Sequence, residues 1–202
     1  MKVKKIILCF LSALLLFSGL FHAASFADED TKTVIFDDGL PTDTAFCVPG
    51  DRLCYHSAEG IISCALDGTD RKIVSAKTGT LFSDGKELFL GSQSEIIRIA
   101  DDGEEELLLR VYPLVNEGAF AIMNTMSHFA ARDGVVYYVL TMAQDYELWK
   151  VSTEDGSNQR VCSICPPDCE ILEMSLRENA DGIFIRYRNQ DSTGCTLLYV
   201  SE

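Results

Sequence analysis

Short apolar segments alternate with glycine turns from about residue 45 to the end of this chain. The repeating unit is an apolar strand, a Gly turn, a second strand, a loop, a third strand, an Asp-Gly turn and a fourth strand. Self-similarity at a roughly fixed spacing is typical of repeat architectures. The Gly turn recurs at residues 49–51, 84–85, 133–134 and 181–182, and the Asp-Gly turn at 67–68, 102–103 and 155–156.

The segments between these turns have the composition of β-strands. They are short and rich in β-branched and aromatic residues, as in residues 88–90, 96–100 and 136–138. Asp-Gly pairs between such segments favour tight hairpins. Helical periodicity is weak, and residues 117–129 are the one place where it could indicate a helix. The pattern predicts an all-β protein.

The number of repeats predicts the architecture. The units span about residues 45–74, 80–111, 128–162 and 175–202, and the last one lacks its fourth strand. An apolar segment at residues 33–36 resembles the missing strand. Pairing this segment with the last unit would remove open sheet edges, which otherwise invite aggregation. We therefore predict a β-propeller of about four four-stranded antiparallel blades, with the N-terminal strand closing the last blade.

The first 27 residues have the order of a secretory signal peptide. Lys2, Lys4 and Lys5 precede an apolar run at residues 6–17, and small residues flank a cleavage position at 25–27. An uncleaved membrane anchor is the alternative, although the apolar run is short for a membrane span. We expect a secreted or extracytoplasmic protein with one propeller domain at residues 28–202. The signal segment is then its only membrane contact.

The acidic composition restricts the possible partners. The formal charge is −14, and loss of the three N-terminal lysines would make it −17. Such a surface repels phosphate backbones, so we expect no nucleic-acid partner.

The repeat resembles known propeller families. The matching pieces are residues 61–70, a strand followed by an Asp-Gly turn, and residues 133–138, an Asp-Gly turn followed by a strand. The resemblance covers nearly all of residues 33–202. In these elements the chain is similar to YWTD (low-density-lipoprotein-receptor-like) and TolB-type propellers, and to bacterial secreted propellers of unknown function. It departs from them because it has no Tyr-Trp-Thr-Asp element, and those families usually have six blades. The resemblance implies the propeller fold and no particular ligand.

Uneven spacing between repeats indicates where binding would occur. Gly50 and Gly85 are 35 residues apart, whereas the next two intervals are 49 and 48 residues. The extra residues fall in the links between blades and between second and third strands, which share one face, and insertions on one face often mark the binding face. Exposed aromatic rings make rigid contacts with proteins or glycans. The candidate binding residues are Tyr112, Phe120, His128 and Tyr146. Alternatively, the aromatic side chains among them pack the loops against the propeller, and His128 is only a residue at the end of a strand.

Seven cysteines remain beyond the signal segment, an odd number. Cys47 and Cys54 flank the first Gly turn symmetrically, so a tight hairpin would place them opposite each other, within reach of a disulfide. Cys162, Cys165 and Cys169 form the densest cluster, which we expect to be a disulfide-pinned loop. Their spacing also fits three zinc thiolates, but we expect no metal and no cofactor.

No catalytic constellation stands out. The repeated aspartates precede glycine, as hairpin turns require, and lack the spacing of calcium loops. We therefore expect a non-catalytic extracellular module that binds a protein or a cell-surface glycan. Two alternatives remain: a hydrolase or lyase with its site at the mouth of the propeller channel, and a partial propeller completed by self-association as a homodimer.

Overall fold

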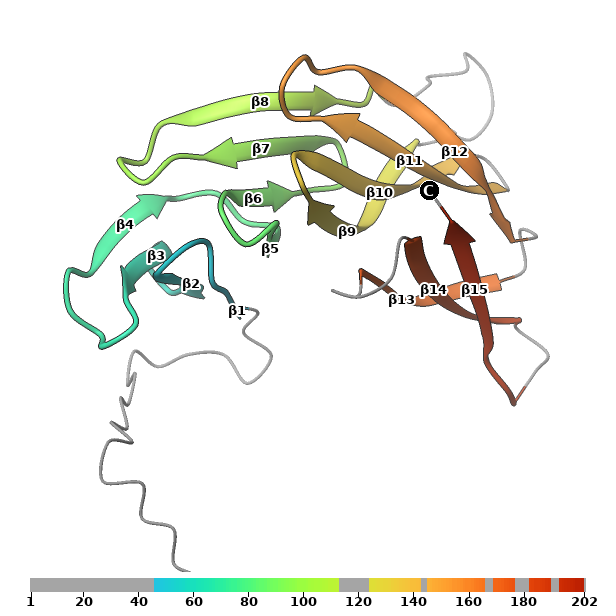
Figure 1. The fold of residues 1–202 in the computed structure, drawn as a ribbon, viewed down its shortest axis with the longest axis horizontal. Helices are drawn as coiled ribbons and strands as arrows, with labels where there is room; N and C mark the ends of the chain where they lie inside the picture. The colour runs from blue at the N-terminus through green and yellow to red at the C-terminus, as the bar shows by residue number, and fades with distance from the viewer. Residues whose placement is uncertain are drawn as a thin grey trace, which may run out of the picture. The chain divides into compact units, whose positions relative to one another are not determined.

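The computed structural model describes residues 46–112, 124–142, 145–165, 169–176, 182–189 and 193–201. These residues form antiparallel strands joined by turns and links, with no helix among them (Figure 1). The first two sheets have four strands each, and we call them blades 1 and 2. Blade 1 contains β1 (Phe46–Cys47), β2 (Arg52–Ser57), β3 (Gly60–Ala65) and β4 (Lys72–Ser75). Blade 2 contains β5 (Thr80–Ser83), β6 (Leu88–Gly91), β7 (Glu95–Ile99) and β8 (Glu105–Arg110).

The remaining two sheets, blades 3 and 4, have longer strands. Blade 3 contains β9 (Thr125–Arg132), β10 (Val135–Met142), β11 (Asp145–Ser152) and β12 (Asn158–Cys165). Blade 4 contains three strands in its described part, β13 (Cys169–Leu176), β14 (Gly182–Asn189) and β15 (Thr196–Ser201). In every blade the strands pair in chain order, so each blade is a simple up-and-down meander.

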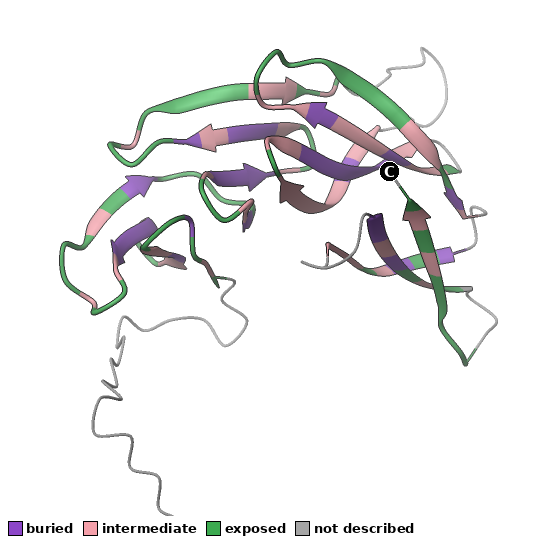
Figure 2. Ribbon diagram, viewed as in Figure 1, coloured by how far each residue is buried: buried purple, intermediate pink, exposed green. Residues whose placement is uncertain are grey.

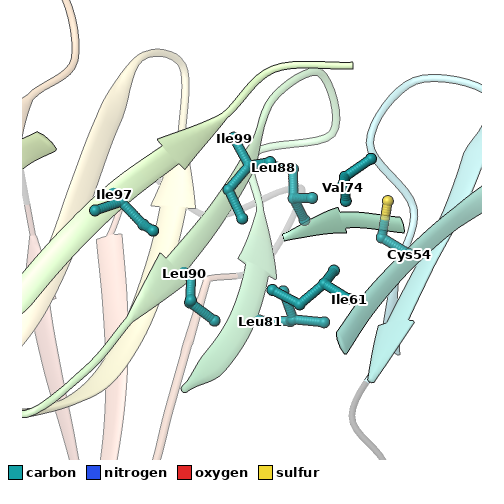
Figure 3. Packing of buried hydrophobic residues seen from close by; sticks show 8 residues of the cluster. All are labelled: Cys54, Ile61, Val74, Leu81, Leu88, Leu90, Ile97 and Ile99. Atoms are coloured by element: carbon teal, nitrogen blue, oxygen red, sulfur yellow. The ribbon is translucent and has the colours of Figure 1, made fainter. Parts of the chain in front are cut away.

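Successive blades meet through their first strands and through apolar side chains. β1 contacts β5, β5 contacts β9, and β9 contacts β13. One apolar cluster joins blades 1 and 2 through Ile61, Val74, Leu88 and Ile99, among others (Figure 3). Similar clusters join blade 2 to blade 3 and blade 3 to blade 4. Meanders that pack face to face and touch through their first strands form a β-propeller, so the predicted all-β propeller is confirmed.

This packing explains why the central strands are apolar without alternation. A strand buried on both faces has an uninterrupted apolar run. All four residues of β6 are buried, and so are residues 136–140 of β10. The outermost strand of blade 2, β8, begins with exposed glutamates (Figure 2). Burial of each Leu or Ile in these clusters contributes about 1.5–3 kcal/mol, so the interfaces between blades hold the fold together.

The turns contain the positive-φ glycines and the aspartate hydrogen bonds that the sequence predicts. Gly85 and Gly103 both have a φ of +90°, a conformation that disfavours other residues. The carboxylates of Asp67, Asp102 and Asp155 each accept a hydrogen bond of 3.0 Å from the backbone N–H two residues later. These carboxylates therefore stabilise turns.

The expected helix can be compared with the structure only in part, and the expected signal segment and closing strand cannot be compared with it. The helix considered at residues 117–129 is wrong where the structure describes it, because Thr125–Phe129 pair with β10 as part of β9. Residues 117–123 lie outside the described residues, as do the signal segment 1–27 and the closing strand 33–36.

Candidate functional site

The propeller has two faces with different connections. One face carries the link from β4 to β5 (residues 76–79) and the turn from β6 to β7 (residues 92–94), and we call it the link face. The other carries the turns at residues 84–87 and 100–104, and we call it the turn face. The sequence pattern favours the link face for binding.

A pocket of about 610 Å³ opens on the link face between blades 2 and 3. Its lining comes from three chain segments, residues 78–80, 91–93 and 125–129. These segments belong to the link before β5, the end of β6 and the start of β9, and β9 contacts both β5 and β6. We call it the inter-blade pocket.

A β-bulge shapes the β9 side of this pocket. Tyr138 pairs with Phe129 and Val139 with Ser127, so His128 is an extra residue between two pairs. His128 has a φ of +51°, in the left-handed region that few residues other than glycine adopt. Bulges of this kind re-aim side chains and are common beside active sites. Residues with strained backbones cluster at functional sites, so His128 marks this pocket as a candidate site.

The surroundings of His128 favour the neutral form of its imidazole. Its Nδ1 lies 2.9 Å from the hydroxyl oxygen of Ser127. Burial lowers the pKa of His128 below its ordinary value, and a hydrogen bond with the backbone of Ile171 in blade 4 opposes this only in part. A neutral imidazole can both donate and accept a hydrogen bond.

Close packing of glycines and aromatic rings forms one wall of the pocket. The ring of Phe129 stacks on Phe82 at 5.5 Å, and Phe82 stacks on Phe89 at 5.4 Å. A Cβ atom on Gly91 would lie 2.6 Å from the Phe129 ring, and one on Gly79 would lie 2.5 Å from the Gly91 carbonyl oxygen. Only glycine fits at these two positions, so backbone atoms form part of the wall.

Hydrogen bonds hold the rim of the pocket in place. The backbone N–H of Met126 donates to the Gln93 carbonyl oxygen at 2.8 Å, which joins blade 3 to blade 2. His56 Nε2 lies 2.9 Å from the Gly79 carbonyl oxygen. The hydroxyl of Ser92 accepts a hydrogen bond of 2.9 Å from the N–H of Glu95 within the turn. The bond between Met126 and Gln93, together with the pairing of Thr80 with Gly91, fixes the three lining segments relative to one another.

The lining is almost uncharged and combines apolar side chains with polar groups. Hydroxyls of threonine and serine and the Gln93 amide are its polar side-chain groups, and among its described residues His128 alone is titratable. Asn124, directly before the lining residue Thr125, has a buried Oδ1 atom that accepts no hydrogen bond among the described residues. Hydroxyls and amides recognise neutral polar ligands, whereas anions or cations need a charged partner.

A larger pocket of about 750 Å³ lies on the turn face, and several of its charged groups form ion pairs. Arg98 forms ion pairs with Glu87 and Glu106. Glu105 pairs with Lys77 at 2.7 Å, and the hydrogen bonds from Lys77 and Ser75 lower the pKa of its carboxyl group. The charges of this pocket therefore stabilise blade 2 and its contact with blade 1.

The structure separates the four candidate binding residues. His128 lines the inter-blade pocket. Tyr112 is 70% exposed beyond the end of β8 and does not line it. Phe120 lies outside the described residues.

The fourth candidate, Tyr146, lies in β11 and packs against the apolar cluster between blades 3 and 4. Tyr146 directly follows the first residue of β11, because β10 and β11 pair as far as Met142 and Asp145, and its role in binding stays a prediction.

Sequence reasoning missed the polar lining residues. Thr80, Gln93 and Ser127 occupy segments that the repeat spacing had already marked as the binding face, and their hydroxyl and amide groups were a usable signal. The glycines at 79 and 91, outside any turn motif, were a second signal.

Most cysteines of the described residues lie on strands, and Cys195 directly precedes β15. Cys47 and Cys54 are direct partners across β1 and β2, as the symmetric spacing predicts. Cys162 and Cys165 belong to β12 and Cys169 begins β13, and residues 166–168 between these strands lie outside the described residues. Whether a disulfide pins this link stays a prediction.

The described residues contain no group of three or more His, Cys, Asp or Glu side chains arranged to hold a metal ion. No helix in this described part is long and apolar enough to cross a membrane.

Comparison with solved structures supports the fold. An oligogalacturonate lyase in complex with manganese, a propeller-type protein, superposes with a TM-score of 0.55 at 10% identity, covering 77% of this chain and 49% of the lyase. The chain has a β-propeller-type fold. The extracellular domain of the putative hybrid two-component system BT4673 from B. thetaiotaomicron gives 0.50 at 13% identity, covering 83% of this chain and 23% of that one.

Other comparisons add nothing to the fold assignment. TolB from Acinetobacter baumannii gives a TM-score of 0.31 at 9% identity, covering 81% of this chain and 56% of that one, which is too low to carry an argument. No protein-family model matches the chain, and no curated protein sequence matches it. This chain spans about half the length of the lyase and about a quarter of the BT4673 domain.

Proposed function

We propose that this protein is an extracytoplasmic, non-catalytic binding module that takes a neutral glycan into the inter-blade pocket. The observation that carries the proposal is the lining, which combines hydroxyls and an amide with a single titratable side chain. Sugar hydroxyls both donate and accept hydrogen bonds, and Ser, Thr and Gln side chains do the same. The pocket volume of about 610 Å³ also lies within the range of about 300–1,000 Å³ of small-molecule sites.

An extracytoplasmic location is part of this proposal. Its support is the order of the first 27 residues, with lysines, an apolar run and small residues. The similarity to a domain described as extracellular is in keeping with it. In such a compartment glycans are abundant ligands, and the acidic chain would avoid anionic surfaces.

Titration calorimetry with a panel of neutral oligosaccharides tests the proposal. Gln93→Ala and Thr125→Ala each remove one polar group from the pocket, and each lost hydrogen bond of about 0.5–1.5 kcal/mol weakens binding about 2- to 10-fold. The matched control is Glu104→Ala on the turn face, which should bind like the wild-type protein. Equal affinity of all variants, or a loss only in Glu104→Ala, would contradict the proposal. Binding of a protein but of no oligosaccharide would contradict the glycan assignment.

A lyase activity is the second candidate. The observation that favours it is a neutral, strained histidine in the pocket of a chain similar to an oligogalacturonate lyase. A neutral imidazole near pH 7 is a suitable general base. Against it, the described lining holds no second titratable group to neutralise a uronate carboxylate or to assist the leaving group.

Incubation with oligogalacturonate separates the two candidates. A lyase would produce unsaturated ends that absorb ultraviolet light, and His128→Asn, which tolerates a positive φ, would abolish that signal. The binding proposal predicts no absorbance change with either protein. A signal lost in His128→Asn would assign the lyase activity instead.

A further inference from the structure

We propose that Cys47 and Cys54 are an oxidation site, where a cross-strand disulfide joins β1 to β2, the first two strands of blade 1. The two residues are direct partners in the pairing of β1 with β2. This inference concerns the covalent state of the propeller and does not depend on the ligand proposed for the inter-blade pocket.

The hairpin geometry sets the distance between the two residues. Arg52 N–H donates to the Pro49 carbonyl oxygen at 3.1 Å, which closes a turn with Gly50 and Asp51 at its centre. Hydrogen-bonded and non-hydrogen-bonded pairs alternate along an antiparallel ladder, so Cys47 and Cys54 form the next hydrogen-bonded pair. Such a pair has a Cα separation of about 5.5 Å. Disulfides need a Cα separation of about 4.4–6.8 Å, so the pair is within reach.

The third cysteine of blade 1 cannot take the place of either partner. Cys54 is opposite Ser63 in the pairing of β2 with β3, whereas Cys64 is opposite Leu53. Adjacent residues of a strand point to opposite faces of the sheet. Cys54 accordingly packs in the cluster between blades 1 and 2, and Cys64 packs in a separate cluster on the other face.

Both partners face the same apolar interface. Cys54 is 2% exposed, and Cys47 packs against the cluster that contains it (Figure 3 shows Cys54 with Val74 and Ile61). Burial raises the pKa of the Cys47 thiol to about 12, with a smaller effect from Cys54, and burial also raises that of Cys54. Thiolates are the reactive form. Exchange is therefore slow once blade 1 has packed on blade 2, and the bond forms while the hairpin is open.

The reaction balances with a small disulfide as oxidant. Each thiol loses its proton and one electron as the Sγ–Sγ bond forms. The two electrons and two protons reduce one oxidised glutathione molecule to two thiols. The product encloses eight residues, from Cys47 to Cys54, and ties the two-residue strand β1 to β2.

Peptide mapping of the full chain tests the inference. The protein is refolded with oxidised glutathione, alkylated under denaturing conditions and digested with trypsin, which cleaves after Arg52 between the two cysteines. We expect a disulfide-linked pair of peptides that contains Cys47 and Cys54 and persists in Cys64→Ala. The pair should be lost in Cys47→Ala. Because Cys54 and Cys64 share one tryptic peptide, the Cys64→Ala variant removes the ambiguity.

Resistance to reductant provides the second readout. In the native protein the bond should survive a reductant that cleaves it fully in denaturant, because the interface excludes the reagent. Cys47 and Cys54 both recovered alkylated after refolding, or a link from Cys47 to Cys64 in the wild-type protein, would overturn the inference.

Discussion

Gly91→Ala tests how the wall of the inter-blade pocket is built. An added Cβ atom would lie 2.6 Å from three atoms of the Phe129 ring, well inside van der Waals contact. The ring is held by its stacking on Phe82 at 5.5 Å, which limits how far it can move aside. Overpacking of this kind costs about 1–3 kcal/mol. In a domain of this size each kcal/mol lowers the melting temperature by about 2–4 °C.

Urea unfolding of a double-mutant cycle measures this contact. The second change is Phe129→Leu, which removes the ring and makes room for the added methyl group. Alone, each substitution should destabilise the protein, but the pair should be destabilised by less than the sum, because the clash exists only when both alanine and ring are present. Additive effects, or a wild-type stability of Gly91→Ala, would refute the close approach of Gly91 to Phe129.

Three further predictions concern the core and its titration. In urea unfolding, Phe89→Ala at a fully buried site should lower the free energy of unfolding by about 3–5 kcal/mol. The control Phe46→Ala, at a 69% exposed site, should change the free energy of unfolding by less than about 0.5 kcal/mol. Tyr138→Phe removes a 2.9 Å hydrogen bond to Asn158 Oδ1 and should cost about 0.5–1.5 kcal/mol; an unchanged urea midpoint would contradict that bond. Burial lowers the pKa of His128 in the folded state, so the unfolded state binds a proton first, and stability should fall as the pH drops below about 6.5. His128→Asn should flatten this dependence, and an equally steep loss in the variant would assign it to other groups.

The fold could be predicted because its signals are local. An aspartate before glycine stabilises a turn through its own carboxylate, as Asp67 and Asp102 do. Each turn fixes two neighbouring strands, and the repetition of turns gives the number of blades. The central strand β6 is apolar throughout because it is buried on both faces, which its sequence of four residues already indicates.

The site could be predicted only in outline. Thr80, Gln93 and Ser127 belong to three segments that meet only after blades 2 and 3 have packed, and no local pattern joins them. The sequence places His128 on the candidate binding face, but its left-handed backbone comes from a bulge, which depends on pairing with β10. The packing of Tyr146 against the cluster between blades 3 and 4 depends on contacts between distant strands, which sequence periodicity does not show.

Hydrogen exchange with and without a bound oligosaccharide tests most directly whether the inter-blade pocket is the binding site. The protein is compared alone and with the tightest ligand of the calorimetric panel. We predict slower exchange in residues 91–93 and 125–129, which line the pocket, and no change at residues 84–87 and 100–104 on the turn face. Protection confined to the turn face, with the pocket segments unchanged, would contradict the account.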